Sequence, residues 1–446
     1  MAEDEESVTT AGRPFHVMTK PNGPACNLDC DYCYYLETAE LFPERSAFRM
    51  SEETLETYVR QYIEAQPGSE VTFAWQGGEP TLLGVDFFRR ALELQEQYAP
   101  PGMVVQNTLQ TNGTLLDDEW CQFLAEHDFL VGISIDGPRH LHDRFRRTRG
   151  DDPTFEAVYE GLILLQEHGV EYNVLCVVNA VNVRHPLEVY TFFREEAVEW
   201  LQFVPLVEPL DGDGSGSAAS RRMVAPDHRI PGWVAEHGGT VEKADDDYEA
   251  VVEAARGAPV SERSVDPEAF GAFLCTIFDE WVRNDIGNMS VRLFDSCLEN
   301  HLYGRASACV YNETCGAQLA VEHDGSVYAC DHFVDPGFRR GNVHEDHLAV
   351  LVDASDQRRF GAYKREGLPG RCRACPVRAY CHGGCPKNWL LETPDGELGL
   401  NYLCAGYRRF FTYVRPYLDL IEETVENGLP FPLAMDAVAV RDERTP

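Results

Sequence analysis

The chain has 446 residues, of which 44% are hydrophobic and 25% are charged. This composition predicts a globular protein with a sizeable core and excludes a disordered or fibrous chain. Asp and Glu total 74 against 38 Lys and Arg, a formal net charge of −36, so nucleic acid and membrane surfaces are disfavoured as partners. The sequence has no apolar run long enough to span a membrane and no secretory leader, which predicts a cytoplasmic protein.

The basic residues are almost all arginines, and the only lysines are Lys20, Lys243, Lys364 and Lys387. An acidic surface with few lysines predicts a halophilic protein, because concentrated salt screens the repulsion between its carboxylates. An acidic protein from a low-salt cytoplasm is the alternative.

From residue 15 to 207, short β-rich runs alternate with segments that carry apolar residues at helical spacing. The expected strands are Phe15–Lys20, Val71–Gln76, Met103–Thr111, Phe129–Ile135, Val170–Val178 and Leu201–Val207. The expected helices are Glu52–Ala65 (N-cap Ser51), Asp86–Tyr98, Asp118–His127 (N-cap Asp117), Phe155–His168 and Pro186–Glu196. Repeated strand–helix units predict an α/β fold with a partial (β/α)6 barrel over residues 12–208, although a doubly wound sheet fits the same pattern. In either fold, ligands bind at the carboxyl ends of the strands.

The composition changes after the barrel. Residues 209–266 contain the run DGDGSGSAAS and an acidic stretch, which predict a solvated, flexible insertion with one helix near Asp247–Ala255. Residues 267–308 follow as a linking helical segment. Residues 309–446 form a cysteine-rich region that ends in a helix, Tyr402–Asn427, which we expect to be broken at Pro416.

Fifteen cysteines in a chain without a secretory leader point to metal ligands or redox groups rather than disulfides. Four lie in apolar stretches and are expected to be small core residues: Cys121, Cys176, Cys275 and Cys297. Cys26, Cys30 and Cys33 follow the first strand within eight residues. Three thiolates in one loop suit a [4Fe–4S] cluster with one open iron, whereas a structural zinc site needs a fourth ligand, which the nearby sequence lacks.

The spacing Cys26-x3-Cys30-x2-Cys33, with Tyr32 before its last cysteine, resembles the signature of radical S-adenosylmethionine enzymes. Gly77-Gly78-Glu79-Pro80, after the second strand, resembles that family's motif for the methionine amino group. The glycines let the backbone approach closely, and Glu79 is expected to balance the ammonium. The resemblance implies S-adenosylmethionine as cofactor, held by Tyr32, Gly77, Gly78, Glu79, Ser134, Asp136, Arg146 and Val207. Turn capping is the alternative for Ser134 and Asp136.

Eight cysteines of the C-terminal third resemble the SPASM domain, which carries two auxiliary [4Fe–4S] clusters. The family pattern implies Cys309, Cys315, Cys330 and Cys385 as ligands of the first cluster, and Cys372, Cys375, Cys381 and Cys404 as ligands of the second. With the early triplet, the resemblance therefore implies three [4Fe–4S] clusters. Full cysteine ligation suits electron transfer. One or two zinc sites are the alternative, since Cys372-x2-Cys375 alone fits a zinc knuckle.

Asp331 directly follows Cys330, and this constellation resembles the anaerobic sulfatase-maturating enzymes, in which the matching aspartate is the general base. The resemblance implies oxidation of a cysteine or serine in a sulfatase polypeptide to Cα-formylglycine, with a low-potential electron donor as a second partner. A bland surface carboxylate is the alternative for Asp331. Another SPASM-type peptide-modifying enzyme, for instance one that forms thioether crosslinks, and a zinc-binding interaction protein are the alternatives for the whole chain.

Overall fold

The computed structural model describes residues 9–42, 48–210, 248–429, 435 and 438. It divides into two compact units, each assembled from separate stretches of the chain. The first unit contains Met1–Ser134, Asp143–Tyr172 and Gly316–Ala362, and the second contains Ile135–His142, Asn173–Cys315 and Tyr363–Pro446. Within the described residues, no helix is both long enough and apolar enough to cross a membrane.

The first unit is built on a sheet with the strand order β10-β9-β8-β1-β2-β3-β4. Its strands are β1 (His16–Lys20), β2 (Glu70–Trp75), β3 (Val104–Thr111), β4 (Leu130–Ser134), β8 (Gln318–Glu322), β9 (Ser326–Tyr328) and β10 (Arg339–Asn342). Strands β1 to β4 and β8 run parallel, and β9 and β10 are added antiparallel. A segment of the cysteine-rich third, β8, therefore pairs directly with the first strand of the chain.

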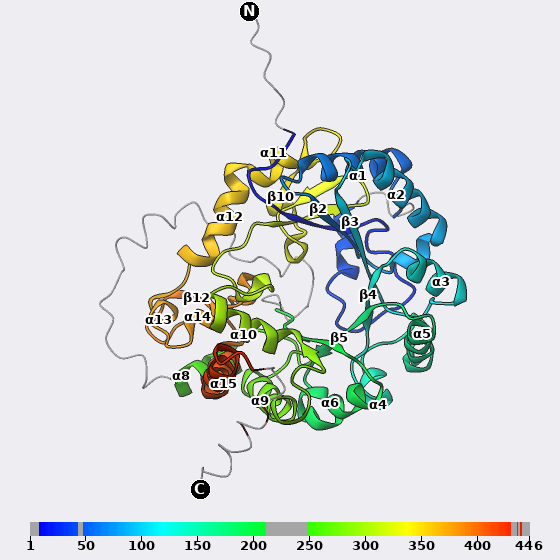
Figure 1. Cartoon of the computed structure of the whole chain (residues 1–446). Coiled ribbons are helices and arrows are strands. Elements are labelled where there is room, and N and C mark those ends of the chain that lie inside the picture. Colours follow the sequence, from blue (N-terminus) through cyan, green and yellow to red (C-terminus); the bar gives the residue numbers. More distant parts are fainter. Residues whose placement is uncertain (1–8, 43–47, 211–247, 430–434, 436–437, 439–446) are drawn as a thin grey trace, which may run out of the picture. The chain divides into compact units, whose positions relative to one another are not determined.

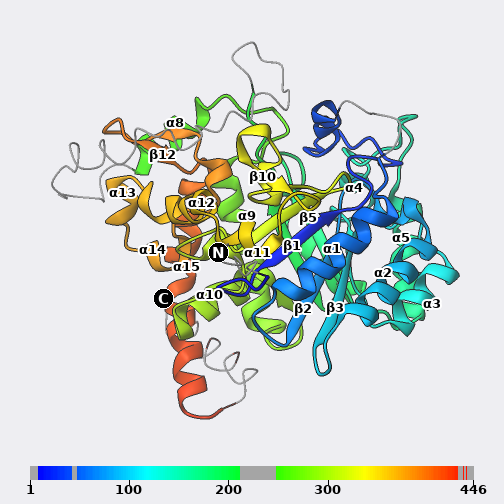
Figure 2. The same cartoon turned by 90° about the horizontal axis from the view of Figure 1, so that it is seen from above.

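Helices cover one face of this sheet, as Figures 1 and 2 show for α1, α2, α3 and α5. The helices are α1 (Glu52–Ala65), α2 (Val85–Tyr98), α3 (Asp118–Glu126), α5 (Phe155–Glu167) and α11 (Leu348–Asp353), and α12 (Ser355–Glu366) follows α11. Both predicted N-caps are confirmed, since Ser51 accepts from Thr54 N and Asp117 accepts from Trp120 N. Each cap satisfies a backbone donor that the first helical turn leaves unpaired.

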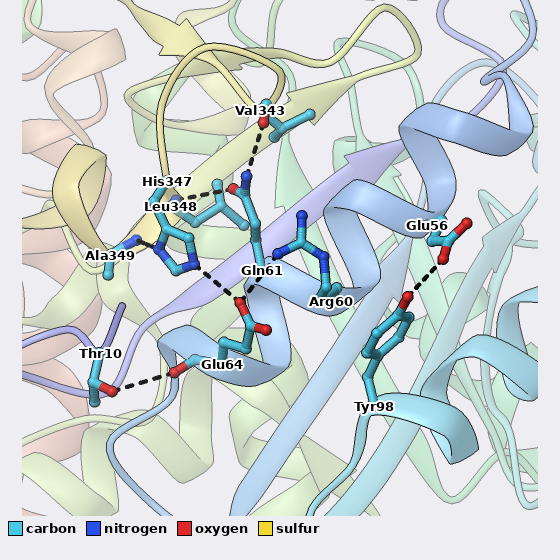
Figure 3. Close-up of polar contacts among 10 residues, drawn as sticks. All are labelled: Thr10, Glu56, Arg60, Gln61, Glu64, Tyr98, Val343, His347, Leu348 and Ala349. Atoms are coloured by element: carbon cyan, nitrogen blue, oxygen red, sulfur yellow. Dashed lines mark hydrogen bonds and ion pairs between the residues drawn. The ribbon is translucent and has the colours of Figure 1, made fainter. Parts of the chain in front are cut away.

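Helix α1 links the sheet to the C-terminal strands of the same unit. Tyr58 and Tyr62 of α1 pack on Phe73 and Trp75 of β2, with ring centroids 5.1 to 6.1 Å apart. On another side of the helix, the Gln61 amide donates to Val343 O at 2.8 Å and its oxygen accepts from Leu348 N at 3.1 Å (Figure 3). Residues almost 290 positions apart are thus held together by one buried side chain.

The second unit contains the parallel strands β5 (Tyr172–Val178, whose first residue is assigned to the first unit), β6 (Trp200–Pro205) and β7 (Ser290–Val291) and the antiparallel pair β11 (Leu391–Glu392) and β12 (Leu398–Leu400). Its helices are α4 (Arg139–His142), α6 (Pro186–Glu195), α8 (Tyr248–Arg256), α9 (Pro267–Asn284), α10 (Arg292–Tyr303), α13 (Gly370–Arg373), α14 (Arg378–Cys381) and α15 (Cys404–Glu426). Short 3-10 helices in the two units are Leu36–Leu41, Pro80–Leu83, Asn182–Arg184, Cys309–Tyr311, Asp331–Phe333, Pro336–Phe338 and Pro386–Asn388. Helices α9 and α15 pack along each other.

One sequence-based expectation differs from the structure. The break at Pro416 is wrong, because α15 continues through this residue to Glu426. Apolar residues on both sides of it, including Val414 and Leu418, are buried and offset the local cost of proline.

Most of the predicted insertion, residues 211–247, lies outside the described residues. The helix expected near Asp247–Ala255 is confirmed as α8 (Tyr248–Arg256). Its residues Val251, Val252 and Ala255 are almost fully buried.

The core cysteines and the α/β architecture agree with the expectations. Cys121, Cys176, Cys275 and Cys297 are all buried. The helices and strands of residues 15–207 begin and end within about two residues of the predicted bounds in most cases. The spacing of apolar residues was sufficient to predict these bounds, because each element buries one face.

Candidate active site

The loop that follows β1 carries the early cysteine triplet at the carboxyl edge of the first unit's sheet. Cys26, Cys30 and Cys33 are half-buried, and a turn bond from Cys33 N to Cys30 O, at 2.9 Å, folds the loop back on itself. Cys26 Sγ accepts from Leu28 N at 3.4 Å and from the Asn112 amide at 3.8 Å. Donors directed at a ligating sulfur are a usual feature of iron–sulfur sites.

The chemistry of these thiols fits a bound iron–sulfur cluster. Burial raises the pKa of Cys26 to about 11, and the nearby Glu79 and Cys33 add to the rise. A buried cluster of thiols needs positive charge to become a set of thiolates, and metal binding supplies it. Among the residues that the structure describes, no group of three His, Cys, Asp or Glu side chains is spaced to hold a single metal ion.

The Gly77-Gly78-Glu79 segment is fastened to the cysteine loop by its backbone. Gly78 N donates to Gly23 O at 2.7 Å and Glu79 N donates to Ala25 O at 2.8 Å. A Cβ on Gly78 would lie 2.0 Å from Ala25 O, so only glycine permits this approach. The sequence predicts that these glycines let the backbone approach a ligand closely. In the structure, Gly78 closely approaches the loop that bears the cysteine triplet.

Glu79 is fully buried, and both of its carboxylate oxygens accept hydrogen bonds from the protein. Oε1 accepts from Thr111 Oγ1 at 2.7 Å and from Thr81 Oγ1 at 2.6 Å, and Oε2 accepts from Asn112 N at 2.6 Å. Burial raises the pKa of Glu79, although these hydrogen bonds oppose the rise. The side chain therefore joins the loops after β2 and β3, and its contact with a methionine ammonium stays a prediction.

Three further candidate cofactor residues belong to the first unit. The Arg146 guanidinium lies 5.6 Å from the ring centroid of Tyr32, and both side chains are buried. The third, Ser134, ends β4, where its Oγ accepts from the Gln110 amide at 3.1 Å. The structure thus brings Tyr32 and Arg146 together, in a geometry that favours the cation over the ring face.

Two other candidates, Asp136 and Val207, belong to the second unit and are both buried. Asp136 Oδ1 accepts from Val177 N at 2.9 Å, and Asp136 N donates to His142 Nδ1 at 3.3 Å. The Asp136 carboxylate thus bonds to strand β5 rather than to its own turn, and its contact with the cofactor stays a prediction. His142 is fully buried at the end of the short helix α4, eight residues after β4.

Asp331 lies within the same unit as the cysteine triplet, because β8 and β9 bring it beside β1. It forms an ion pair with Lys20, the last residue of β1, and accepts from Tyr34 Oη at 3.1 Å. Burial alone would raise the pKa of Asp331, but the positive charges of Lys20 and His332 outweigh it and hold the pKa below its usual value. The carboxylate is therefore ionised, as a proton acceptor must be.

Lys20, Tyr35 and Glu322 are further residues around Asp331 to which the sequence motifs gave no role. The Lys20 ammonium lies 4.7 Å from the ring centroid of Tyr35, whose hydroxyl donates to Glu322 Oε1 at 2.5 Å. The sequence offered one signal for Lys20, the scarcity of lysine: one of only four lysines lies at the end of an apolar strand.

The remaining cysteines group by unit. In the second unit, Cys372 interacts electrostatically with Cys375, Cys381 and Cys404, which places the predicted second set together. Cys315 interacts likewise with Cys309 and Cys385, whereas Cys330, the fourth member of that predicted set, belongs to the first unit. Burial raises the pKa of Cys381 to about 12 and that of Cys404 to about 11, as in the triplet.

Comparison with known proteins matches two family models. Residues 23–193 match the radical SAM superfamily, and residues 304–376 match the SPASM iron–sulfur cluster-binding domain. A serine-type anaerobic sulfatase-maturating enzyme of Bacteroides thetaiotaomicron is 40% identical over 93% of this chain and 93% of its own length. A cysteine-type enzyme of Clostridium perfringens is 33% identical over 91% of this chain and 97% of its own length.

This chain belongs to the anaerobic sulfatase-maturating enzymes. The solved structure of native anSMEcpe with bound AdoMet and the Cp18Cys peptide is 33% identical, covers 92% of this chain and 99% of its own, and has a TM-score of 0.74. The chain is thus a radical SAM enzyme that acts on a protein substrate. Its cofactors are S-adenosylmethionine and three iron–sulfur clusters, and its fold joins a radical SAM domain to a SPASM domain.

Proposed function

We propose that this sulfatase-maturating enzyme oxidises a cysteine or serine side chain of a sulfatase polypeptide to Cα-formylglycine. Relatives of both the serine type and the cysteine type, at 33% to 40% identity, support this substrate class. The observation that carries the proposal is the ionised, buried Asp331 beside the loop that bears the cysteine triplet.

In this proposal, the chain's own residues bind the cofactors and move one proton. Cys26, Cys30 and Cys33 hold one cluster, and the two SPASM sets hold the others: Cys309, Cys315, Cys330 and Cys385, and Cys372, Cys375, Cys381 and Cys404. When bound, S-adenosylmethionine and the triplet's cluster supply the radical chemistry that removes a hydrogen atom from the substrate Cβ. Eight further residues shape the site for the cofactor: Tyr32, Gly77, Gly78, Glu79, Ser134, Asp136, Arg146 and Val207.

Asp331 accepts the thiol or hydroxyl proton of the substrate residue. Removing this proton concentrates negative charge on the substrate and makes its loss of a second electron easier. Tyr34 and Lys20 contact the two carboxylate oxygens of Asp331. A low-potential electron donor, which reduces the enzyme before the reaction, is the second partner in the proposal. We also place the enzyme in the cytoplasm, because a reducing compartment preserves clustered thiols.

An Asp331→Asn variant tests this role. The reconstituted and reduced variant is expected to form 5′-deoxyadenosine from S-adenosylmethionine at nearly the wild-type rate, but to form oxidised peptide about a hundredfold more slowly. Asp86→Asn is the matched control, because Asp86 is fully exposed. Unchanged peptide oxidation by Asp331→Asn would remove Asp331 from the proposal.

A further inference from the structure

Lys20 occupies a position where a cation is costly. Its side chain is 1% exposed at the carboxyl end of β1. The preceding residue, Thr19, donates to the Tyr58 hydroxyl of α1 at 2.6 Å. Since successive strand residues point to opposite faces, Lys20 points to the face away from α1, where its side chain is almost fully excluded from solvent. A buried ammonium persists only when its three donors are satisfied.

The Lys20 ammonium is held by three different segments of the first unit. It forms the ion pair with Asp331, which follows β9. It donates to Gln76 Oε1 at 3.2 Å, directly after β2, and it contacts the ring of Tyr35, two residues after the last triplet cysteine. The ammonium thus joins the ends of neighbouring strands to the cysteine loop.

The partners of Lys20 are fixed in turn. Glu322 is the Cα partner of Lys20 in the β1–β8 ladder, and it is fully buried. Its Oε1 accepts from the Tyr35 hydroxyl, which fixes the plane of the ring beneath the ammonium. The β8 strand thus orients Tyr35 through Glu322, and Tyr35 and Gln76 both contact the ammonium that pairs with Asp331.

We propose that Lys20 is a positioning residue, whose ammonium, fixed by Gln76 and by the Tyr35–Glu322 pair, holds the Asp331 carboxylate in the orientation needed to accept the substrate proton. This inference rests on the proposed function of Asp331. A side chain that accepts a proton must be placed within fractions of an ångström, and its supporting residues provide that placement. The alternative role for Lys20 is neutralisation of buried carboxylates, which any cation would perform.

The two roles are separated by Lys20→Arg, which keeps the charge but moves it and replaces a point donor by a planar fork. A positioning role predicts that kcat for peptide oxidation falls about tenfold or more, while KM for the peptide and formation of 5′-deoxyadenosine stay at wild-type values. The ratio of oxidised peptide to 5′-deoxyadenosine therefore falls. Wild-type values of this ratio in Lys20→Arg would overturn the inference. Thr19→Val, at the neighbouring buried position, is the control, with the ratio expected to be unchanged.

Lys20→Met and Asp331→Asn together form a double-mutant cycle, which is measured by thermal stability and needs no turnover. Removing the cation leaves the buried Asp331 carboxylate without its lysine partner, so the unfolding temperature of the cluster-loaded protein is expected to fall. The same change in the Asp331→Asn background is expected to have little effect. Equal losses in both backgrounds would contradict the pairing. If the wild-type enzyme forms no oxidised peptide, the proposed function fails while this cycle still reports on the ion pair. If the wild type is active and Lys20→Arg matches it, only the positioning role fails.

Discussion

Buried carboxylates in this enzyme differ in what surrounds them. Glu79 accepts hydrogen bonds from neutral donors, and burial raises its pKa. Asp331 faces Lys20 and His332, which hold its pKa below the usual value despite burial. The first side chain is suited to joining two loops, and the second stays ionised although it is buried.

A third carboxylate, Asp295 of α10, gives a pH-dependent prediction. Burial raises its pKa to about 6 from a usual value of 3.8, so its charged form disfavours the folded state and stability is lost as pH rises through 6. Asp295→Asn keeps an acceptor for Ser290 Oγ and removes the charge. Its gain in unfolding free energy is expected to grow by about 1 kcal/mol between pH 5 and pH 8.

Urea unfolding of Asp295→Asn and wild type at the two pH values measures this growth. The exposed carboxylate Asp86 provides the control, since Asp86→Asn is expected to show no such pH dependence. An equal effect of Asp295→Asn at pH 5 and pH 8 would show that the Asp295 carboxyl does not titrate as described.

At the scale of elements, helices α9 and α15 of the second unit approach each other closely. A Cβ on Gly406 would lie 2.1 Å from Pro267 O, and one on Gly271 would lie 2.7 Å from Gly406 O. Both added carbons would meet backbone, which cannot move aside as a flexible side chain would. The two glycines therefore set the distance between these helices.

Gly406→Ala is expected to lower the unfolding free energy by about 1 to 3 kcal/mol, because the helices must separate to admit one methyl group. Differential scanning calorimetry of the variant measures the loss. Gly257→Ala is the control, since its nearest neighbours would lie 3.7 Å away. A Gly406→Ala protein as stable as wild type would contradict the packing of α9 on α15.

The elements of residues 15–207 could be predicted because their apolar periodicity is local. The pairing of β8 with β1 could not, since it joins residues about 300 positions apart and neither strand encodes its partner. For the same reason the sequence indicated Asp331 but not Lys20. Asp331 lies beside a cysteine and forms a recognisable motif with it, whereas the role of Lys20 depends on neighbours that only the folded chain brings close. The predicted break at Pro416 was wrong because the sequence does not show how the residues around Pro416 pack.

At the scale of the whole molecule, the net charge of −36 makes stability depend on salt. The Debye length falls from about 10 Å at 0.1 M salt to about 3 Å at 1 M, which screens repulsion between surface carboxylates. We expect the unfolding temperature to rise between 0.1 M and 2 M KCl, as a halophilic protein requires. An unchanged or lower unfolding temperature in 2 M KCl would contradict this expectation.

The account as a whole depends on the modification made to the substrate. The most direct measurement is mass spectrometry of two sulfatase-derived peptides, identical except for serine or cysteine at the target position, after anaerobic incubation with the reconstituted enzyme, a reductant and S-adenosylmethionine. We predict an aldehyde in at least one of them, reactive toward a hydrazide probe. The serine peptide loses two hydrogens, or the cysteine peptide loses two hydrogens and then exchanges its sulfur for the oxygen of water, releasing sulfide. A cysteine peptide that retains its sulfur in a thioether crosslink, or 5′-deoxyadenosine formed while both peptides stay unmodified, would contradict it.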